Sequence, residues 1–81
     1  MSYYEQAILE YIQSEFLVEP VALTVSTPLI EQGIVDSLGL FRLVSFIEEK
    51  FGVQFEPTDV APQNFHTIQA IAAFVQHKSG A

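Results

Sequence analysis

The chain contains no cysteine, so it can form no disulfide and offers neither a thiolate nucleophile nor a sulfur ligand for zinc. Any thiol chemistry must therefore be imported from outside the chain. No apolar run approaches the roughly 20 residues that a membrane-spanning helix needs, and the first residues lack the basic start and apolar core of a signal peptide. We therefore expect a cytoplasmic protein that does not enter membranes.

Basic residues are also scarce. Arg42, Lys50 and Lys78 stand against ten carboxylates, and the formal net charge is −7. Such a charge repels phosphate backbones and anionic lipid surfaces, so neither nucleic acid nor a membrane is an expected partner. It favours solubility and steered, salt-dependent encounters with proteins that carry basic patches.

The length of 81 residues leaves room for one hydrophobic core, and 49% of the residues are apolar, which indicates a folded chain. The sequence shows no linker, repeat or low-complexity stretch. We expect a single domain over residues 1–81, acting as a monomer.

The first half predicts one helix and a long loop. Ser2 and Glu5 have the form of a capping box, and apolar side chains then recur at helical spacing to about Leu17. From 18 to 36 the chain is punctuated by prolines and Gly33, with one brief helical turn expected over 27–30. A loop of this length must be pinned by its own apolar residues. These are Val21, Leu23, Leu29, Ile30, Ile34 and Val35.

The second half predicts three further helices. Asp36 and Ser37 are both good N-cap residues for a helix over 38–51 that Gly52 ends. A short third helix is expected near 58–61, with Pro57 at its first position and Pro62 as its stop, and Thr67 caps the last helix. The predicted fold is all-α: a small four-helix bundle with a long first loop and a short third helix.

Ser37 is the candidate functional residue, because the loop ends there and an apolar helix begins. A hydroxyl at that point is exposed and held in place, although it would also serve as a plain helix cap. The following helix carries apolar residues well beyond one stripe, among them Leu38 and Phe41. Some of them are expected to be exposed for docking, the alternative is that the helix is central and nearly surrounded, and both can hold at different positions.

Three motifs carry a resemblance over essentially the whole chain: Gly-Ile-Val-Asp-Ser-Leu at 33–38, Glu-Glu-Lys-Phe-Gly at 48–52 and Asn-Phe-His-Thr-Ile at 64–68. They resemble acyl and peptidyl carrier proteins, the phosphopantetheine-binding family. The resemblance implies that Ser37 receives 4′-phosphopantetheine from coenzyme A through a phosphodiester, so that the missing thiol is the arm's. The chain would carry acyl or aminoacyl thioesters in fatty-acid, polyketide, nonribosomal-peptide or related biosynthesis.

The resemblance also implies roles beside the serine. Asp36 would assist the metal of a separate phosphopantetheinyl transferase, and Leu38 would contact the transferase and partner enzymes; plain capping and core burial are the respective alternatives. No Ser-His-Asp set forms at short range, because His66 and His77 lie far along the chain. No metal-binding motif appears either. The chain is thus expected not to be an enzyme and to hold no metal.

The docking surface is expected to be mixed in charge. Many fatty-acid carriers have acidic residues just after the motif, whereas this chain has Gly39, and Arg42 lies on the same helix. Gly39 would loosen the first turn by roughly 1 kcal/mol against alanine, or admit a partner closely. The candidate docking residues are Leu38, Gly39, Phe41, Arg42 and Glu48.

The stretches at 37–40 and 64–65 look more like bacterial stand-alone carriers paired with adenylate-forming ligases than like fatty-acid synthase carriers. That likeness implies an amino acid or small carboxylic acid as cargo, loaded by an activating ligase and passed to an acyltransferase or synthase, with a long acyl chain left open. Two other classes stay open: an adaptor that binds a partner through the apolar face of the second helix, with Ser37 only a cap, and a small enzyme.

Overall fold

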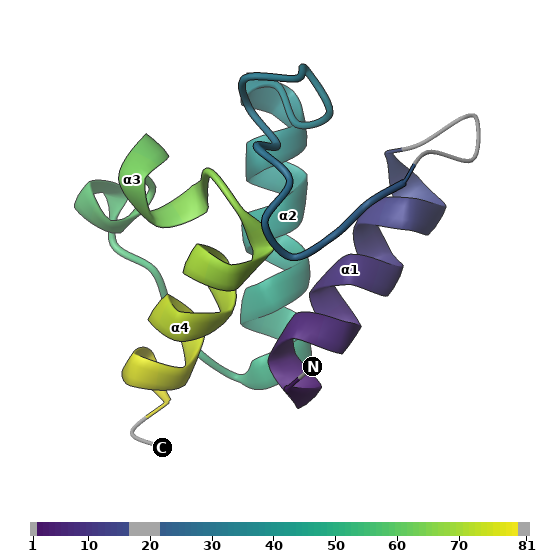
Figure 1. Cartoon of the computed structure of the whole chain (residues 1–81). Helices are drawn as coiled ribbons and strands as arrows, with labels where there is room; N and C mark the ends of the chain where they lie inside the picture. Colours follow the sequence, from purple (N-terminus) through teal and green to yellow (C-terminus); the bar gives the residue numbers. More distant parts are fainter. Residues whose placement is uncertain (1, 17–21, 80–81) are drawn as a thin grey trace.

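The structure is a computed structural model that describes residues 2–16 and 22–79 (Figure 1). Within these residues the elements are, in order, α1 (Tyr3–Glu15), α2 (Ser37–Phe51), the 3₁₀ helix η1 (Pro57–Asp59), α3 (Pro62–Phe65) and α4 (Ile68–Lys78), with no strand. The predicted all-α fold with a short third helix is confirmed. None of the helices in the described ranges has the length and apolar character that spanning a bilayer requires.

The first helix begins as its sequence predicts. Ser2 Oγ accepts a hydrogen bond from Glu5 N at 3.1 Å, and Ser2 N donates to a Glu5 carboxylate oxygen at 2.9 Å, which completes a capping box. The helix ends at Glu15, with Phe16 as its C-cap. Leu17, the predicted end, lies outside the described residues.

The central helix, α2, is capped by Asp36 rather than Ser37. A carboxylate oxygen of Asp36 accepts the Gly39 N–H at 2.7 Å, and Ser37 is the first helical residue. At the other end Gly52 has φ +69°, the left-handed conformation that commonly closes a helix. Of the two predicted N-caps, the aspartate therefore holds the position.

The prediction for the short third helix was wrong in its place. Pro57 begins η1 as expected, but the chain then turns at Val60 and Ala61, and Pro62 starts α3 instead of stopping a helix. Proline suits the first helical position because the N–H it lacks would have no helical partner there. The same property lets it follow one helix or open the next.

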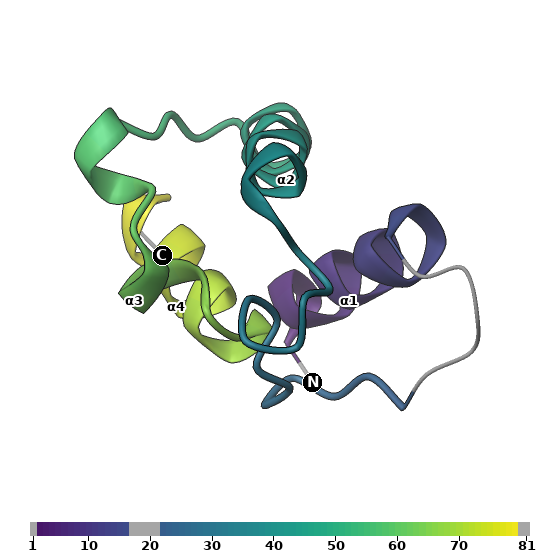
Figure 2. The ribbon, with the colours of Figure 1, turned by 90° about the horizontal axis from the view of Figure 1, so that it is seen from above.

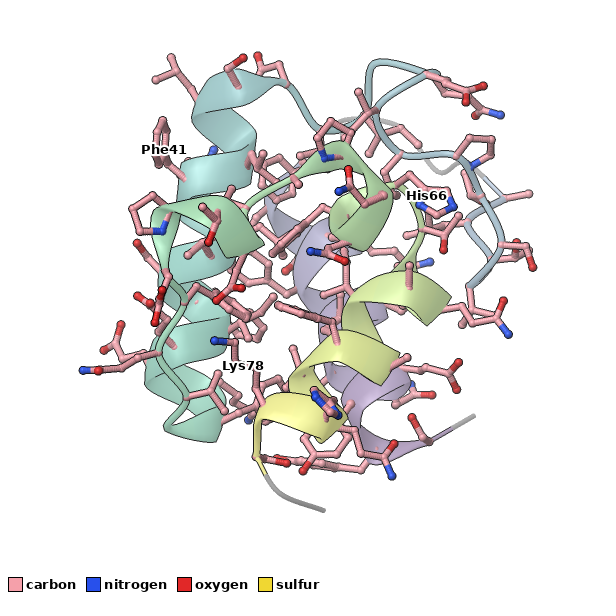
Figure 3. The ribbon with its side chains drawn as sticks, turned by 90° about the vertical axis from the view of Figure 1, so that its left-hand side faces the viewer. Phe41, His66 and Lys78 are labelled. Atoms are coloured by element: carbon pink, nitrogen blue, oxygen red, sulfur yellow. The ribbon has the colours of Figure 1, made fainter. Side chains whose placement is uncertain are left out.

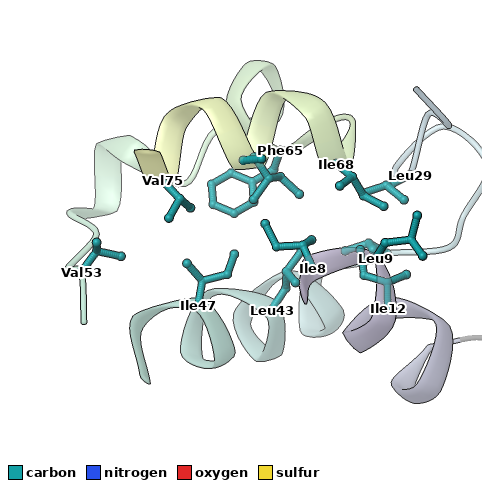
Figure 4. Packing of buried hydrophobic residues seen from close by; sticks show 13 residues of the cluster. Ile8, Leu9, Ile12, Leu29, Leu43, Ile47, Val53, Phe65, Ile68 and Val75 are labelled. Atoms are coloured by element: carbon teal, nitrogen blue, oxygen red, sulfur yellow. The ribbon is translucent and has the colours of Figure 1, made fainter. Parts of the chain in front are cut away.

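The core lies where α1, α2 and α4 face one another (Figures 2 and 4). Its fully buried side chains include Ile8 and Ile12 from α1, Leu43 and Ile47 from α2, and Ile68, Ile71 and Val75 from α4, with Phe65 from α3. Their helical spacing places each set on one face of its helix. The backbones of α1 and α4 approach closely, as do those of α3 and α4.

The segment from 22 to 36 is pinned to the bundle as predicted. Leu29 is fully buried (Figure 4), and its N–H donates to the carbonyl of His66, just before α4, at 2.8 Å. The N–H of Gln69, in turn, donates to the Val25 carbonyl at 3.0 Å. Val35 is also buried, whereas Ile30 is exposed, and Val21 lies outside the described residues. Because this loop is anchored, the position at which the chain enters the first turn of α2 is fixed.

Candidate functional site

Ser37 stands at the start of α2, where the pinned loop meets the helix, and its side chain is exposed. Asp36 provides the cap, so the serine hydroxyl is not needed to satisfy the first N–H groups of the helix. The interpretation of Ser37 as a plain cap therefore loses its basis. The hydroxyl faces solvent on a firmly placed backbone, which is the arrangement a modification site requires.

The start of α2 is electrostatically suited to an anion. The amides of the first turn lie at the positive end of the helix dipole; the Asp36 carboxylate accepts the Gly39 N–H, and no acidic side chain follows within that turn. A phosphate held at such a helix start is stabilised by the free N–H groups and the dipole together. A phosphodiester on Ser37 would thus be accommodated although the whole chain carries a charge of −7.

A shallow depression of about 330 Å³ lies beside the serine. The loop, the first turns of α2 and the start of α3 meet around it, and most of its lining side chains are apolar. The lining residues are Ile30, Gly33, Val35, Asp36, Ser37, Leu40 and Pro62. A flexible arm attached to the serine would begin at the rim of this depression, so the residues present fit a phosphopantetheine group.

The outer face of α2 exposes two large apolar side chains next to Ser37. Leu38 is 75% exposed and Phe41 is 68% exposed, and their spacing of three residues places them on one face. Phe41 projects from α2 away from the other helices (Figure 3). Leu43 and Ile47, in contrast, are fully buried on the opposite face. The two interpretations of the apolar helix thus apply to different positions, and Leu38 does not belong to the core.

Gly39 does not share that exposure, which corrects its place among the docking residues. It is buried, and the edge of the Phe16 ring lies so close that a Cβ on Gly39 would be 2.7 Å from Phe16 Cε1. The small size of the glycine makes room for the Phe16 ring at the end of α1, which leaves no space there for a partner. Arg42 is exposed; its guanidinium lies 3.4 Å from a Glu15 carboxylate oxygen and 5.1 Å from the centre of the Phe16 ring.

Glu48 lies apart from the group around the serine. It lies eleven positions after Ser37, about 16 Å along an α-helix. Its carboxylate accepts the N–H of Phe55 at 2.9 Å and so fastens the segment that follows α2. The structure brings Asp36, Ser37, Leu38 and Phe41 together and leaves Glu48 with a structural contact.

Sequence reasoning overlooked Phe16 and Pro62. Phe16 contacts Gly39 although the two residues are 23 positions apart in the chain. Pro62, at the start of α3, lines the depression beside Ser37. A signal for Phe16 was present, since a glycine inside a helix often marks a close approach by another part of the structure. It did not say which residue approaches.

Residues 6–75 match the model of a protein family described as "Phosphopantetheine attachment site". The chain is also similar to "Probable acyl carrier protein PigG" of Serratia sp. (strain ATCC 39006), with 37% identity over 73 residues that cover 89% of this chain and 84% of the relative. The prosthetic group that the family implies is 4′-phosphopantetheine. Because the family match runs from within α1 to within α4, the chain belongs to the phosphopantetheine-binding carrier proteins, as a non-catalytic acyl carrier protein of a biosynthetic route.

Proposed function

We propose that Ser37 carries the phosphopantetheine arm and that acyl or aminoacyl cargo travels on the arm's thiol as a thioester. The observation that supports this most directly is the exposed serine at the first position of α2, relieved of capping by Asp36. The absence of cysteine from the sequence agrees with a thiol brought in by the arm. The arm supplies the thiol chemistry, and the protein supplies a fixed attachment point and a surface that partners recognise.

Attachment requires a separate phosphopantetheinyl transferase. Ser37 Oγ forms a bond to the phosphorus next to pantetheine in coenzyme A, the pyrophosphate link breaks, and the nucleotide half leaves. A serine hydroxyl needs a base to lose its proton. Asp36 Oδ1 accepts the Gly39 N–H, which leaves the second oxygen of this carboxylate available to a metal. We infer that the transferase takes the proton, while Asp36 holds the turn and assists the transferase's metal.

Partners are expected to contact the outer face of α2. Leu38 and Phe41 offer apolar area, and Arg42 provides a cation fixed by Glu15 and Phe16. An activating ligase would load the arm, and an acyltransferase or synthase would accept the cargo. An amino acid or small carboxylic acid as cargo, and the cytoplasmic location expected from the sequence, both stay predictions.

Intact mass tests the attachment site. We expect the purified apo-protein, incubated with coenzyme A, magnesium and a promiscuous transferase, to gain the mass of one phosphopantetheinyl group, and the Ser37→Ala variant to gain none. Because Ser37 is not the cap, the unfolding free energy of the Ser37→Ala variant should equal that of the wild type within about 0.5 kcal/mol, as measured by thermal melting.

Ser45→Ala is the matched control, because Ser45 is exposed on the same helix and should leave the mass gain intact. Folded Ser37→Ala that still gains the arm would place the attachment elsewhere. Wild-type protein that gains no arm, while another carrier is modified in parallel, would favour the adaptor interpretation.

A further inference from the structure

Gly39 makes an unusually close contact with the end of the preceding helix. A Cβ at this position would lie 2.7 Å from Phe16 Cε1, 3.4 Å from Phe16 Cδ1 and 3.1 Å from the Asp36 carboxylate. Real Cβ atoms essentially never approach a heavy atom to 2.7 Å. Any other residue here would push against the phenyl ring and the capping carboxylate at once, two positions beyond Ser37.

Capping does not explain this glycine. The last helix, α4, has the same arrangement: Thr67 is the N-cap, and its hydroxyl accepts the N–H of Ala70, the third helical residue, at 3.0 Å. Alanine therefore serves at the third position beneath a side-chain cap in this same chain. Glycine costs helix stability relative to alanine, so its presence at position 39 calls for a local reason, and the Phe16 ring is that reason.

Phe16 is itself held on three sides. It is the C-cap of α1, its ring meets the Tyr11 ring edge-on with centres 5.8 Å apart, and the Arg42 guanidinium lies over it at 5.1 Å. Arg42 also pairs with Glu15, the last residue of α1. The ring thus packs between the end of α1 and the first turn of α2, so the position of α1, which itself packs on α4, determines where that turn lies.

We propose that Gly39 and Phe16 are positioning residues for transfer of the arm: their contact sets the orientation of the turn that presents Ser37 to the transferase. The inference rests on the proposed attachment at Ser37. Displacement of this turn shifts the serine hydroxyl and the Asp36 carboxylate relative to the phosphorus that the hydroxyl must reach. A misplacement of about 1 Å can cost two orders of magnitude in rate.

Steady-state kinetics of arm transfer test the contact. With a promiscuous transferase and coenzyme A, we expect Gly39→Ala to lower kcat by about tenfold or more, with a smaller change in KM because Phe41 stays exposed for docking. Phe16→Ala removes the ring and should lower kcat less. In the double variant the overlap with the ring no longer exists, and only the 3.1 Å approach to the capping carboxylate is left. Ala70 shows that a helix start in this chain tolerates alanine beneath a cap, so the kcat of the double variant should equal that of Phe16→Ala alone.

Ala70→Gly is the matched control. It replaces alanine with glycine at the third position of α4, so it lowers the melting temperature without touching the Ser37 turn, and its kcat should equal the wild-type value. A wild-type kcat in Gly39→Ala would overturn the proposal, as would a double variant in which the two losses simply multiply. Should Gly39→Ala alone fail to fold, the double variant and Phe16→Ala still decide between these outcomes.

Amide hydrogen exchange provides a readout that needs no arm. The N–H of Gly39 is bonded to Asp36, and we expect it to exchange faster in Phe16→Ala than in wild type, while the N–H of Ala70 is unchanged. Unchanged exchange at Gly39 would show that the ring does not hold this turn. Lack of arm transfer to the wild type would instead count against attachment at Ser37 and leave the exchange result standing.

Discussion

At the scale of single residues, Asp36 performs a capping task that Ser37 could also have performed. The aspartate caps α2 through a 2.7 Å bond to the Gly39 N–H, and the serine is left exposed at the first helical position. Sequence alone favoured neither, because both side chains are good N-caps. The choice follows from where the loop, anchored by buried Val35, enters the helix.

The Asp36→Asn variant separates the capping role of this side chain from the role of its charge. Asp36→Asn keeps an acceptor for the Gly39 N–H, so we expect stability close to wild type but slower arm transfer, since the charge that assists the transferase's metal is gone. Asp36→Ala removes both, and should in addition cost about 1 kcal/mol of unfolding free energy. Urea unfolding and the rate of mass gain measure the two effects; an Asn variant that is modified at the wild-type rate would leave Asp36 a cap only.

Gly39 shows what residue-level reasoning could not reach. Its place two residues after the serine made it a candidate docking residue whose small size could admit a partner, whereas the structure buries it against Phe16. The residue that covers it, Phe16, ends a different helix, and no local pattern connects the two. The carboxylate of Glu48 likewise accepts a hydrogen bond from Phe55 N, which its position in the helix did not predict.

At the scale of elements, α2 has one buried face and one exposed apolar face. Ile47→Ala should cost about 2–5 kcal/mol of unfolding free energy, because Ile47 is fully buried. Phe41→Ala should change stability by less than about 0.5 kcal/mol, since two-thirds of the side chain already faces solvent. Phe41→Ala should nevertheless slow loading by the ligase, measured as thioester formation on the arm.

The two variants of α2 act as controls for each other. A large loss of stability in Phe41→Ala would assign this ring to the packing of the bundle and remove it from the docking surface. Unchanged thioester formation in a stable Phe41→Ala variant would also count against docking at this position.

The connection between η1 and α4 depends on pH. The Lys78 ammonium, together with the Glu56 N–H, holds the pKa of the Asp59 carboxyl below its ordinary value of 3.8. Because the folded pKa lies below the unfolded one, the stabilisation is fully present above pH 3.8 and is lost as pH falls through the folded pKa. Melting temperatures of wild type and Asp59→Asn should therefore differ at neutral pH and converge in acid below 3.8. A constant difference across that range would contradict the link.

At the scale of the whole molecule, the charge of −7 acts over a body of 34 × 25 × 20 Å. At 10 mM salt the Debye length is about 30 Å, so the carboxylates repel one another across the entire domain, whereas at 0.15 M it is about 8 Å. We expect the melting temperature to rise when sodium chloride is raised between these concentrations, measured by circular dichroism at pH 7. A falling melting temperature would mean that the ion pairs Arg42–Glu15 and Lys78–Asp59 outweigh the repulsion.

The sequence by itself determined the three longer helices, the caps at Ser2, Gly52 and Thr67, the anchored loop and the serine at the start of α2. Helical periodicity and capping act within one or two turns, so Ser2, Thr67 and Gly52 could be assigned without the fold. It misplaced α3 because Pro62 satisfies the local rules for a stop and a start equally. Only the tertiary structure decided which side chains of α2 face solvent and why position 39 is glycine, since those outcomes depend on contacts between residues far apart in the chain.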